Sequence, residues 1–365
     1  MKASSHREEI TLLLELSIQR PSESEFSELL QNISAHFDWT YFLERAISSN
    51  LAGYLLSHPI QAKAHFPAFV FEKIASYQQR IQMHSLQLLD LLKELVGLFE
   101  AHLIDYAVLK GCAGLLNQSF SFKTRQVSDI DILIDPSKQK EVYALLQTNG
   151  FQMSTSIYPT KWHQKHPTDH APMHAHKNGK IVDIHIRLFP VHTGYQIDTF
   201  ELLKNRQTVV FDKAPYMLLD SKEAELFNIL HTYKHLYFGN MFKAGGLPDL
   251  YQMDFPAYID LAQKWGTTKQ LAQMNDFWNS WLRREYNATF LGKTALRFIE
   301  NRPFTVEEKL ITLYRRIFKS QKNLLHPMRL YGKLFPSKAY LNSYFGEGSY
   351  LAAWLRRFCK MFKFG

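Results

Sequence analysis

Two aspartates stand two positions apart in the segment RQVSDIDILI, residues 125–134. In a β-strand, residues i and i+2 point to the same face, so Asp129 and Asp131 project together while the isoleucines around them face the core. Two adjacent carboxylates without a partner repel each other, and one of them keeps its proton. A divalent cation bound between them removes this conflict. The pattern therefore favours a metal site over a solvent-facing strand edge.

A third carboxylate, Asp183, lies downstream in KIVDIHIRL, residues 180–188, in alternating strand register and on the same face as His185. Three strand-borne acids suit one or two Mg²⁺ ions, which bind oxygen ligands and help to hold substrate phosphates. Mn²⁺ is the alternative cation. We therefore expect Asp129, Asp131 and Asp183 to be both metal ligands and catalytic residues.

A turn upstream of these strands has the composition of a phosphate site. A short apolar strand, residues 106–109, leads into Lys110-Gly111 and an apolar helix from about Cys112. A turn that opens a helix offers free N–H groups, and a lysine beside it adds positive charge. The alternative for Lys110 is a surface side chain whose stem packs on apolar atoms. Ser128, directly before the paired aspartates, could simply cap the strand entry.

The order of these segments is strand, Lys-Gly turn, helix, Ser-Asp-x-Asp strand, helix and third-acid strand. In this order the chain resembles the nucleotidyltransferase superfamily with the polymerase-β-like core. More narrowly, it resembles a bacterial family of poorly characterised nucleotidyltransferases with the pattern LKG … RxxSDIDIL … VDxH. The resemblance covers about residues 25–255, and the matching positions are Leu109–Gly111, Arg125, Ser128–Leu133 and Val182–His185.

This resemblance implies an α+β fold, in which a mixed sheet core of the nucleotidyltransferase type is flanked by N-terminal and C-terminal helical regions. It implies Mg²⁺-dependent transfer of a nucleoside monophosphate from an NTP, with ATP the expected nucleotide. The acceptor would be a hydroxyl-bearing small molecule or a protein side chain. The positions expected to bind the nucleotide are Lys110, Gly111, Arg125, Ser128 and His185.

One position departs from the superfamily pattern. Typical members carry Gly-Ser at the first turn, where the serine contacts nucleotide phosphates, whereas this chain has Gly111-Cys112. The departure motivates an alternative function, a nucleotide-binding or partner-binding module that keeps the fold with weak or no turnover. Nucleic-acid chemistry is a third hypothesis that only the basic C-terminal tail supports, and we do not expect a nucleic-acid partner.

The chain divides into four predicted regions. Residues 1–103 are helical, 104–215 form the α/β core, 216–310 form a helical substrate-side domain, and 311–365 form a basic C-terminal region. The first region ends in one long helix from about residue 69 to 102. Its apolar spacing predicts that Leu86, Leu89, Leu92 and Leu95 are buried.

Two groups of polar residues are candidates for acceptor selectivity. Five histidines gather between strands expected at 151–155 and 180–188, and their spacing matches no standard zinc site. A protonatable loop near the active-site mouth is the favoured interpretation, with His170 as its substrate-side candidate. A later helix carries His231, Lys234 and His235, and Asp249 follows in the next helix. Interhelical polar pairing explains this second group as well as substrate binding does.

Charge is concentrated at the C-terminus. Residues 315–365 hold eleven Lys and Arg against one acid, so the rest of the chain carries a net charge of −1 out of the total of +9. The aromatic and basic tail is predicted to be a helix docked on the protein itself; a peripheral membrane contact and a polyanion contact are the alternatives. A polar N-terminus, two distant cysteines and no run of about 18 apolar residues favour a cytoplasmic protein.

Overall fold

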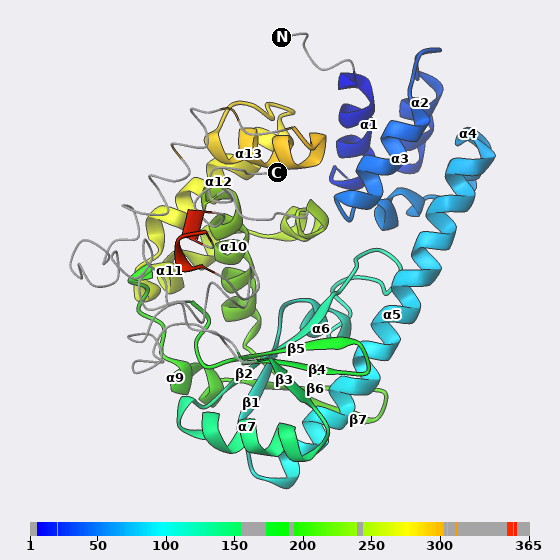
Figure 1. Cartoon of the computed structure of the whole chain (residues 1–365). Coiled ribbons are helices and arrows are strands. Elements are labelled where there is room, and N and C mark those ends of the chain that lie inside the picture. The colour runs from blue at the N-terminus through cyan, green and yellow to red at the C-terminus, as the bar shows by residue number, and fades with distance from the viewer. Residues whose placement is uncertain are drawn as a thin grey trace.

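The computed structural model describes residues 6–19, 21–154, 173–189, 193–238 and 244–302, together with short runs beyond them. The fold is α+β, with a mixed sheet flanked by helices from both ends of the chain (Figure 1). In Figure 1 the N-terminal helices and the helices that follow the sheet lie at the top, and the sheet lies below them. The long helix α5 (Ala68–Ala101) runs down one side and joins the two levels.

Two of the helices before the sheet, α2 (Glu23–Gln31) and α3 (Trp39–Ser48), begin at side-chain caps. At α2, the Ser22 side chain accepts from the Glu25 N–H, and the Glu25 carboxylate accepts from the Ser22 N–H. This capping box satisfies backbone groups that the first turn leaves without partners. The Asp38 side chain caps α3 by accepting a hydrogen bond from the Tyr41 N–H, without a reciprocal contact. The other elements of this region are α1 (Arg7–Ser17), η1 (Ala52–Leu56) and α4 (Pro59–His65).

Within the described residues, seven strands form one sheet in the order β3-β4-β5-β2-β1-β7-β6. The central strand β2 (Asp129–Ile134) pairs in parallel with β5 (Lys180–His185) and antiparallel with β1 (Tyr106–Leu109). The outer strands are β3 (Gln152–Ser154), β4 (Met173–Lys177), β6 (Gln207–Phe211) and β7 (Ala214–Leu218). The helical elements between strands are α6 (Lys110–Leu116), η2 (Pro136–Lys138), α7 (Gln139–Thr148) and α9 (Thr199–Lys204).

The helices after the sheet pack against the N-terminal ones. Trp281 is fully buried, and its backbone carbonyl accepts a hydrogen bond from the Gln19 side chain at 3.0 Å. None of the described helices is long and apolar enough to cross a membrane. The elements are α10 (Ser221–Phe238), η4 (Ala244–Gly246), η5 (Pro248–Gln252), η6 (Phe255–Tyr258), α11 (Ile259–Trp265), α12 (Thr268–Leu282) and α13 (Phe290–Glu300).

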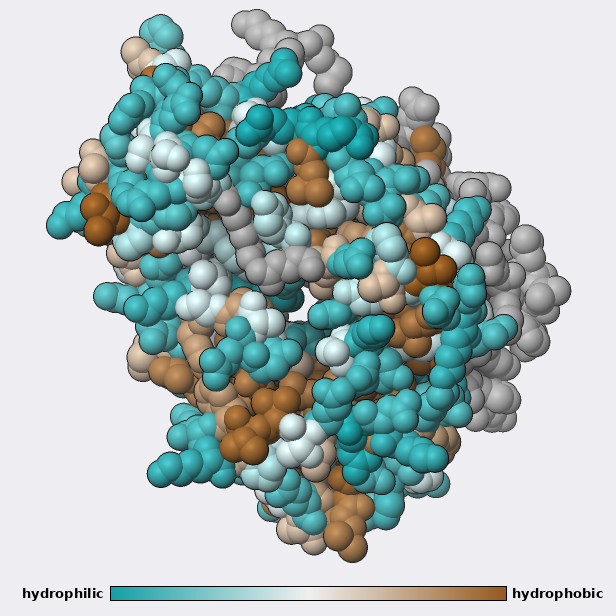
Figure 2. All heavy atoms as spheres, turned by 180° about the vertical axis from the view of Figure 1, so that it is seen from behind, coloured by the Kyte–Doolittle hydropathy of each residue, from teal (hydrophilic) through white to brown (hydrophobic). Residues whose placement is uncertain are grey.

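The buried apolar side chains form two clusters, one on each side of the sheet. The first cluster contains the second half of α5 and one sheet face, including Val108 and Ile132. The second cluster contains the first half of α5, the helices before α5 and the helices after the sheet. The opposite face of the sheet contributes Leu109 and Leu133 to it. Seen from behind, the surface is hollowed near its centre, between the helical part and the sheet (Figure 2). The first and third predicted regions both contribute side chains to the second cluster. The division of the chain into four regions stays a prediction.

The long helix expected at 69–102 is confirmed, but the burial expected for Leu86 is wrong. Leu89, Leu92 and Leu95 are buried, whereas 43% of Leu86 is exposed. A spacing of three advances 300° around a helix, so each step drifts about 60° from the preceding leucine. Leu86 therefore lies outside the buried stripe.

The loop expected for all five histidines is also wrong in part. His174 and His176 lie in β4, which pairs with β5 from Met173 to Lys177. Pairing along the edge of β5 favours an extended conformation that local sequence did not reveal. His163, His166 and His170 lie outside the described residues, as does most of the basic tail.

A buried carboxyl at the start of α10 should make folding stability depend on pH. Glu223 is 7% exposed, and its Oε2 has no hydrogen-bond partner among the residues described. Burial raises the pKa of Glu223 to about 7. The folded state therefore binds more protons than the unfolded state between about pH 4.5 and 7, and stability falls as the pH rises through this window.

We expect Glu223→Gln to raise the free energy of unfolding at pH 8 by about 1–3 kcal/mol, since one pKa unit corresponds to about 1.4 kcal/mol. At pH 4 the variant and the parent should unfold alike. Urea unfolding at both pH values measures the difference. Glu72→Gln, at an exposed position on α5, is the control and should change the free energy of unfolding by about 0.5 kcal/mol or less at either pH. Equal stabilities of parent and Glu223→Gln at pH 8 would contradict the account.

Candidate active site

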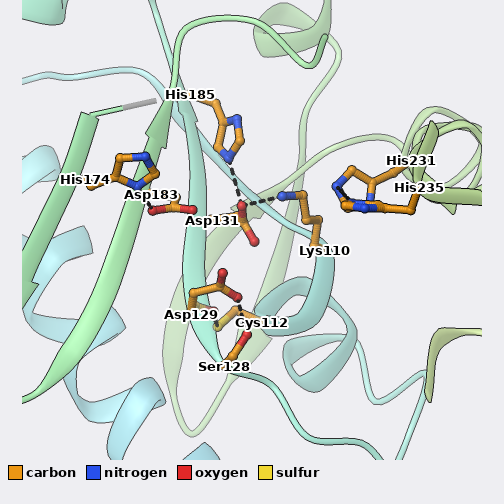
Figure 3. Close-up of polar contacts among 10 residues, drawn as sticks. All are labelled: Lys110, Cys112, Ser128, Asp129, Asp131, His174, Asp183, His185, His231 and His235. Carbon is orange, nitrogen blue, oxygen red and sulfur yellow. Dashed lines mark hydrogen bonds and ion pairs between the residues drawn. The ribbon is translucent and has the colours of Figure 1, made fainter. Parts of the chain in front are cut away.

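The strand register brings the acidic residues of β2 and β5 to one face of the sheet. Asp131 lies directly opposite Asp183 in the parallel pair, and Leu133 lies opposite His185. Neighbouring residues in register point to the same face, and so do residues two apart along a strand. Asp129, Asp131, Asp183 and His185 therefore share the face that lies toward α10, and the close-up shows them from β2 and β5 (Figure 3).

Asp131 is the centre of the hydrogen-bond network on this face. It is only 2% exposed, and its Oδ1 accepts from Lys110 Nζ at 2.5 Å and from His185 Nε2 at 2.7 Å. Burial opposes the charged form, but Lys110 and His185 outweigh burial and hold the pKa of Asp131 below its usual range. Burial lowers the pKa of His185, so the imidazole is neutral at pH 7.

The same group of side chains has the composition of a metal site. Asp131, Asp183 and His185 each offer a ligand atom, and these atoms lie within 4.8 Å of one another. Two carboxylates and a neutral imidazole suit a divalent cation. In this structure Lys110 supplies the positive charge next to Asp131. The residues present therefore fit a bound cation, with His185 joining the two aspartates.

Asp129 lies on the same face but outside this group of three. Its carboxylate turns toward Ser128, whose Oγ donates to Asp129 Oδ1 at 3.0 Å. Burial, followed by the nearby Asp131 charge, raises the pKa of Asp129 to about 6. Burial and the neighbouring carboxylate both oppose a negative charge on Asp129. A cation at this face would favour the charged form.

The Lys110-Gly111 turn places the lysine by its backbone conformation. Lys110 has φ of +50°, in the left-handed region that residues with a side chain rarely adopt. Strain of this kind clusters at functional sites. Gly111 packs so closely on Val127 that an added Cβ would lie 2.7 Å from Val127 Cγ1. The absence of a side chain at position 111 thus lets α6 begin against the segment that enters β2.

We expect Gly111→Ala to lower the free energy of unfolding by about 1–3 kcal/mol, because overpacking forces the neighbours apart. The displacement should also move Lys110 away from Asp131. In Gly111→Ala/Val127→Ala the clash is gone, so the double variant should be more stable than the sum of the two single changes predicts. A double-mutant cycle in urea measures this coupling. Additive changes would show that the Gly111–Val127 contact carries no such constraint.

Cys112 lies in the packed interior and does not line the cavity next to the carboxylates. The residue is fully buried, and its Sγ lies 3.5 Å from the backbone carbonyl of Asp129. Burial raises the pKa of the thiol well above its usual value, so it stays protonated. The position that the superfamily fills with a phosphate-binding serine is therefore an apolar packing position in this chain.

A cavity of about 400 Å³ adjoins the carboxylates. One wall comes from the turn at Lys110 and the start of β2, and the other comes from α10, η4 and η5. No Phe, Tyr or Trp of the described chain lines it, and its apolar lining is limited to Val127, Leu250 and Met253. The volume is within the range of small-molecule sites. A larger cavity of about 850 Å³, between α1 and α2, contains none of these carboxylates.

Arg125 and Asp249 close one side of this cavity. Arg125, in the loop before β2, forms an ion pair with Asp249 in η5, and its guanidinium lies 4.9 Å from the centre of the Phe120 ring. The pair ties the sheet side to the helical side across 124 positions of sequence. A nucleotide contact by Arg125 and a substrate contact by Asp249 stay predictions.

The remaining described candidates lie on α10. His231 and His235 line the cavity, and their Nε2 atoms are 3.3 Å apart. Lys234 lies between them in sequence, while His170 is outside the described residues. His174 on β4 was not predicted as a site residue, but its Nδ1 lies 2.5 Å from Asp183 Oδ1. Local sequence carried no signal for this contact, because it follows from the pairing of His174 in β4 with Asp183 in β5.

Comparison with known proteins gives one match. A family described as uncharacterised nucleotidyltransferase matches residues 35–283, which include both strands of carboxylates, the Lys-Gly turn and α10. No curated protein and no solved structure matches the chain. The match extends past the limit of about 255 that the motifs alone suggested, and it covers more than half of the chain. The protein therefore belongs to this family of uncharacterised nucleotidyltransferases.

Proposed function

We propose that this protein transfers a nucleoside monophosphate from an NTP, with ATP the first candidate, to a hydroxyl group of a small molecule or a protein side chain. The observation that carries the proposal is the cluster of Asp131, Asp183 and His185 at the edge of the 400 Å³ cavity. Membership of a nucleotidyltransferase family supports the reaction class. The proposal covers both classes of acceptor, small molecules and protein side chains.

Mg²⁺, or Mn²⁺ in its place, would be held by Asp131 and Asp183 with His185, and Asp129 lies on the same face to join them. When bound, such an ion neutralises charge on the phosphates that react. The protein contributes position and electrostatics. Lys110 holds the carboxylate of Asp131, and His174 holds that of Asp183, whereas His185 would give up its hydrogen bond to Asp131 in order to bind the ion. Rigid carboxylates of this kind need no rearrangement during the reaction.

Lys110 has a second task in this proposal. Its Nζ bonds to Asp131 and also lines the cavity, so the same ammonium can turn to a phosphate oxygen. A charge-assisted hydrogen bond of this type is stronger than a neutral one. The deep burial of Cys112 excludes a hydroxyl-like contact from that position, and Lys110 would supply the phosphate contact in its place.

The test uses the full chain with each of the four NTPs, Mg²⁺ and a panel of hydroxyl acceptors, and it measures pyrophosphate release. Turnover that requires Mg²⁺ and stops in EDTA is expected. The products, analysed by mass spectrometry, should carry one nucleoside monophosphate per acceptor. Absence of pyrophosphate release with every NTP, while Mn²⁺ and NTP still bind, would leave the binding module as the function.

A specific observation favours that binding module as the second candidate. Cys112 is fully buried, and Lys110 is already paired with Asp131. A site without the phosphate-binding serine, with its lysine held by a carboxylate, can bind a nucleotide with weak turnover. Thermal shift separates this candidate from a protein that does not bind NTP, because about 100 Kd of ligand stabilises the folded state by about 2.7 kcal/mol.

A further inference from the structure

Two amide side chains line the 400 Å³ cavity in addition to the residues described above. They are Asn50, in the turn between α3 and η1, and Gln126, in the loop before β2. Both contact Tyr77 of α5, which is buried and does not line the cavity. The Tyr77 hydroxyl oxygen lies 3.4 Å from Asn50 Oδ1 and 3.3 Å from Gln126 Oε1. Tyr77 is 27 positions from Asn50 and 49 from Gln126, so the fold brings the three together.

Asn50 is held in an uncommon backbone conformation. Its φ of 59° lies in the left-handed region, which asparagine adopts more readily than most residues. Its carbonyl packs so closely on Gly245 of η4 that an added Cβ at position 245 would lie 2.6 Å from the Asn50 oxygen. The Gly245 N–H donates to the Ser49 carbonyl at 3.0 Å. A strained residue persists where the surrounding structure fixes it, and such residues cluster at ligand sites.

The contacts of Tyr77 leave two different polar groups for the cavity. A phenol hydroxyl has one proton, so Tyr77 donates to one amide oxygen at a time. Burial raises the pKa of Tyr77, so the hydroxyl keeps this proton. The second amide is satisfied when its NH₂ group donates to the hydroxyl oxygen instead. Since neither amide bonds to any other described residue, one of them retains an unused NH₂ group and the other an unused carbonyl oxygen.

These two unused groups are neighbours, because both amides contact the same hydroxyl. A donor next to an acceptor matches the hydrogen-bonding edge of a nucleobase, and asparagine and glutamine are side chains that read such edges. We propose that Asn50 and Gln126 bind the base of the nucleotide and that Tyr77 positions both amides. The identity of the ligand rests on the proposed nucleotidyl transfer.

The place of Gln126 in the chain agrees with a base at this point. It precedes Asp129 by three residues, so their Cα atoms are at most about 11 Å apart. The ribose of a nucleotide separates its base from its α-phosphate by a comparable length, so phosphates beside the carboxylates leave the base near Gln126. The apolar lining of the cavity, which consists of Val127, Leu250 and Met253 among the described residues, offers atoms on which the flat faces of a base can pack.

The experiment measures the affinity of the full chain for the α,β-methylene analogues of the four NTPs and for inorganic tripolyphosphate, by calorimetry with Mg²⁺ present. The analogues cannot release pyrophosphate, and tripolyphosphate has no base. The parent should prefer one base over the others. Gln126→Met and Tyr77→Phe, which keep the size of the side chain, should each reduce this preference about three- to tenfold, because a hydrogen bond to the base is lost or misplaced. Both should bind tripolyphosphate as the parent does.

Asn50→Gly tests the second amide, because glycine adopts the left-handed conformation without strain. It should reduce the base preference as Gln126→Met does. Gln87→Ala, at an exposed position on α5, is the matched control and should retain the affinity for every ligand. A parent that binds the four analogues alike, an unchanged base preference in Gln126→Met, or a loss of affinity that is equal for tripolyphosphate would each overturn the proposal.

Steady-state turnover separates the nucleotide from the acceptor, since an acceptor that contains an amide or a base could present the same edge. Gln126→Met should raise the KM for the NTP and leave the KM for the acceptor unchanged. A raised acceptor KM with an unchanged base preference would overturn the assignment to the nucleotide. Base-selective binding that depends on Gln126, in a protein that never releases pyrophosphate from an NTP, would retain the base site and reject nucleotidyl transfer. Pyrophosphate release that is equal for all four NTPs would do the reverse.

Discussion

Asp131→Asn should lower Mg²⁺-dependent pyrophosphate release by about 10³-fold or more, a loss of about 4 kcal/mol of transition-state stabilisation. The variant keeps the shape of the side chain and removes the negative charge at the centre of the Lys110 and His185 hydrogen bonds. A neutral amide cannot replace a carboxylate ligand for a hard cation. Steady-state turnover, together with Mn²⁺ binding by electron paramagnetic resonance, measures the two effects separately.

The matched control is Asp135→Asn, four residues along the same segment. Asp135 accepts a hydrogen bond from the Ser137 N–H as the cap of η2, and asparagine caps a helix as well as aspartate does. This variant should retain turnover. Undiminished turnover in purified Asp131→Asn, with contaminating activity excluded, would remove the catalytic role from Asp131.

The two aspartates of β2 should also differ in their effect on stability in metal-free buffer. Asp131 has two partners, so its replacement by asparagine leaves Lys110 without a counter-charge and should destabilise the protein. The pKa of Asp129 is raised to about 6, so its charged form destabilises the folded state above that pH. Asp129→Asn should therefore unfold at a higher urea concentration than Asp131→Asn at pH 8.

Trp281→Ala should lower the free energy of unfolding by about 3–5 kcal/mol, the usual loss for truncating a buried aromatic side chain. The indole is fully buried, and the centre of its ring lies 5.1 Å from the centre of the Phe277 ring and 5.3 Å from that of the Tyr286 ring. Folded domains are stable by only about 5–15 kcal/mol, so the loss is a large share of the total. Urea unfolding followed by circular dichroism measures it.

Leu282→Ala is the control for this change because it lies next to Trp281 in α12 and is 41% exposed. It should change stability by about 0.5 kcal/mol or less. The Trp281 variant should also bind NTP more weakly, since α10 and α12 belong to the same buried cluster and α10 forms a wall of the cavity. Equal stability of the two variants would place Trp281 outside the joint core of the N-terminal and C-terminal helices.

The strands that carry the carboxylates could be predicted because their signal is local. A period of two places Asp129 and Asp131 on one face whatever the rest of the chain does. The partners of these residues depend on strand pairing instead. His185 reaches Asp131 because β5 lies parallel to β2 in register, and His174 reaches Asp183 because β4 lies antiparallel to β5. Neither pairing is encoded in the segments taken one at a time.

Long-range packing limited the prediction for α10 in the same way. The spacing of His231 and His235 predicted a shared helical face, but the sequence did not tell what that face would meet. The ion pair between Arg125 and Asp249 joins residues 124 positions apart. Such a contact follows from the closure of the cavity by the second apolar cluster, and no local pattern contains it.

Helix α5 contributes its first half to one apolar cluster and its second half to the other. This helix therefore connects the helical part of the molecule to the sheet. The distance between the two cavity walls should depend on how easily the helix bends. Over an arm of about 25 Å, half of what 34 residues span at 1.5 Å each, a bend of about 3° shifts the far end by roughly 1 Å. A ligand that contacts both walls of the cavity would therefore restrict the bending of α5.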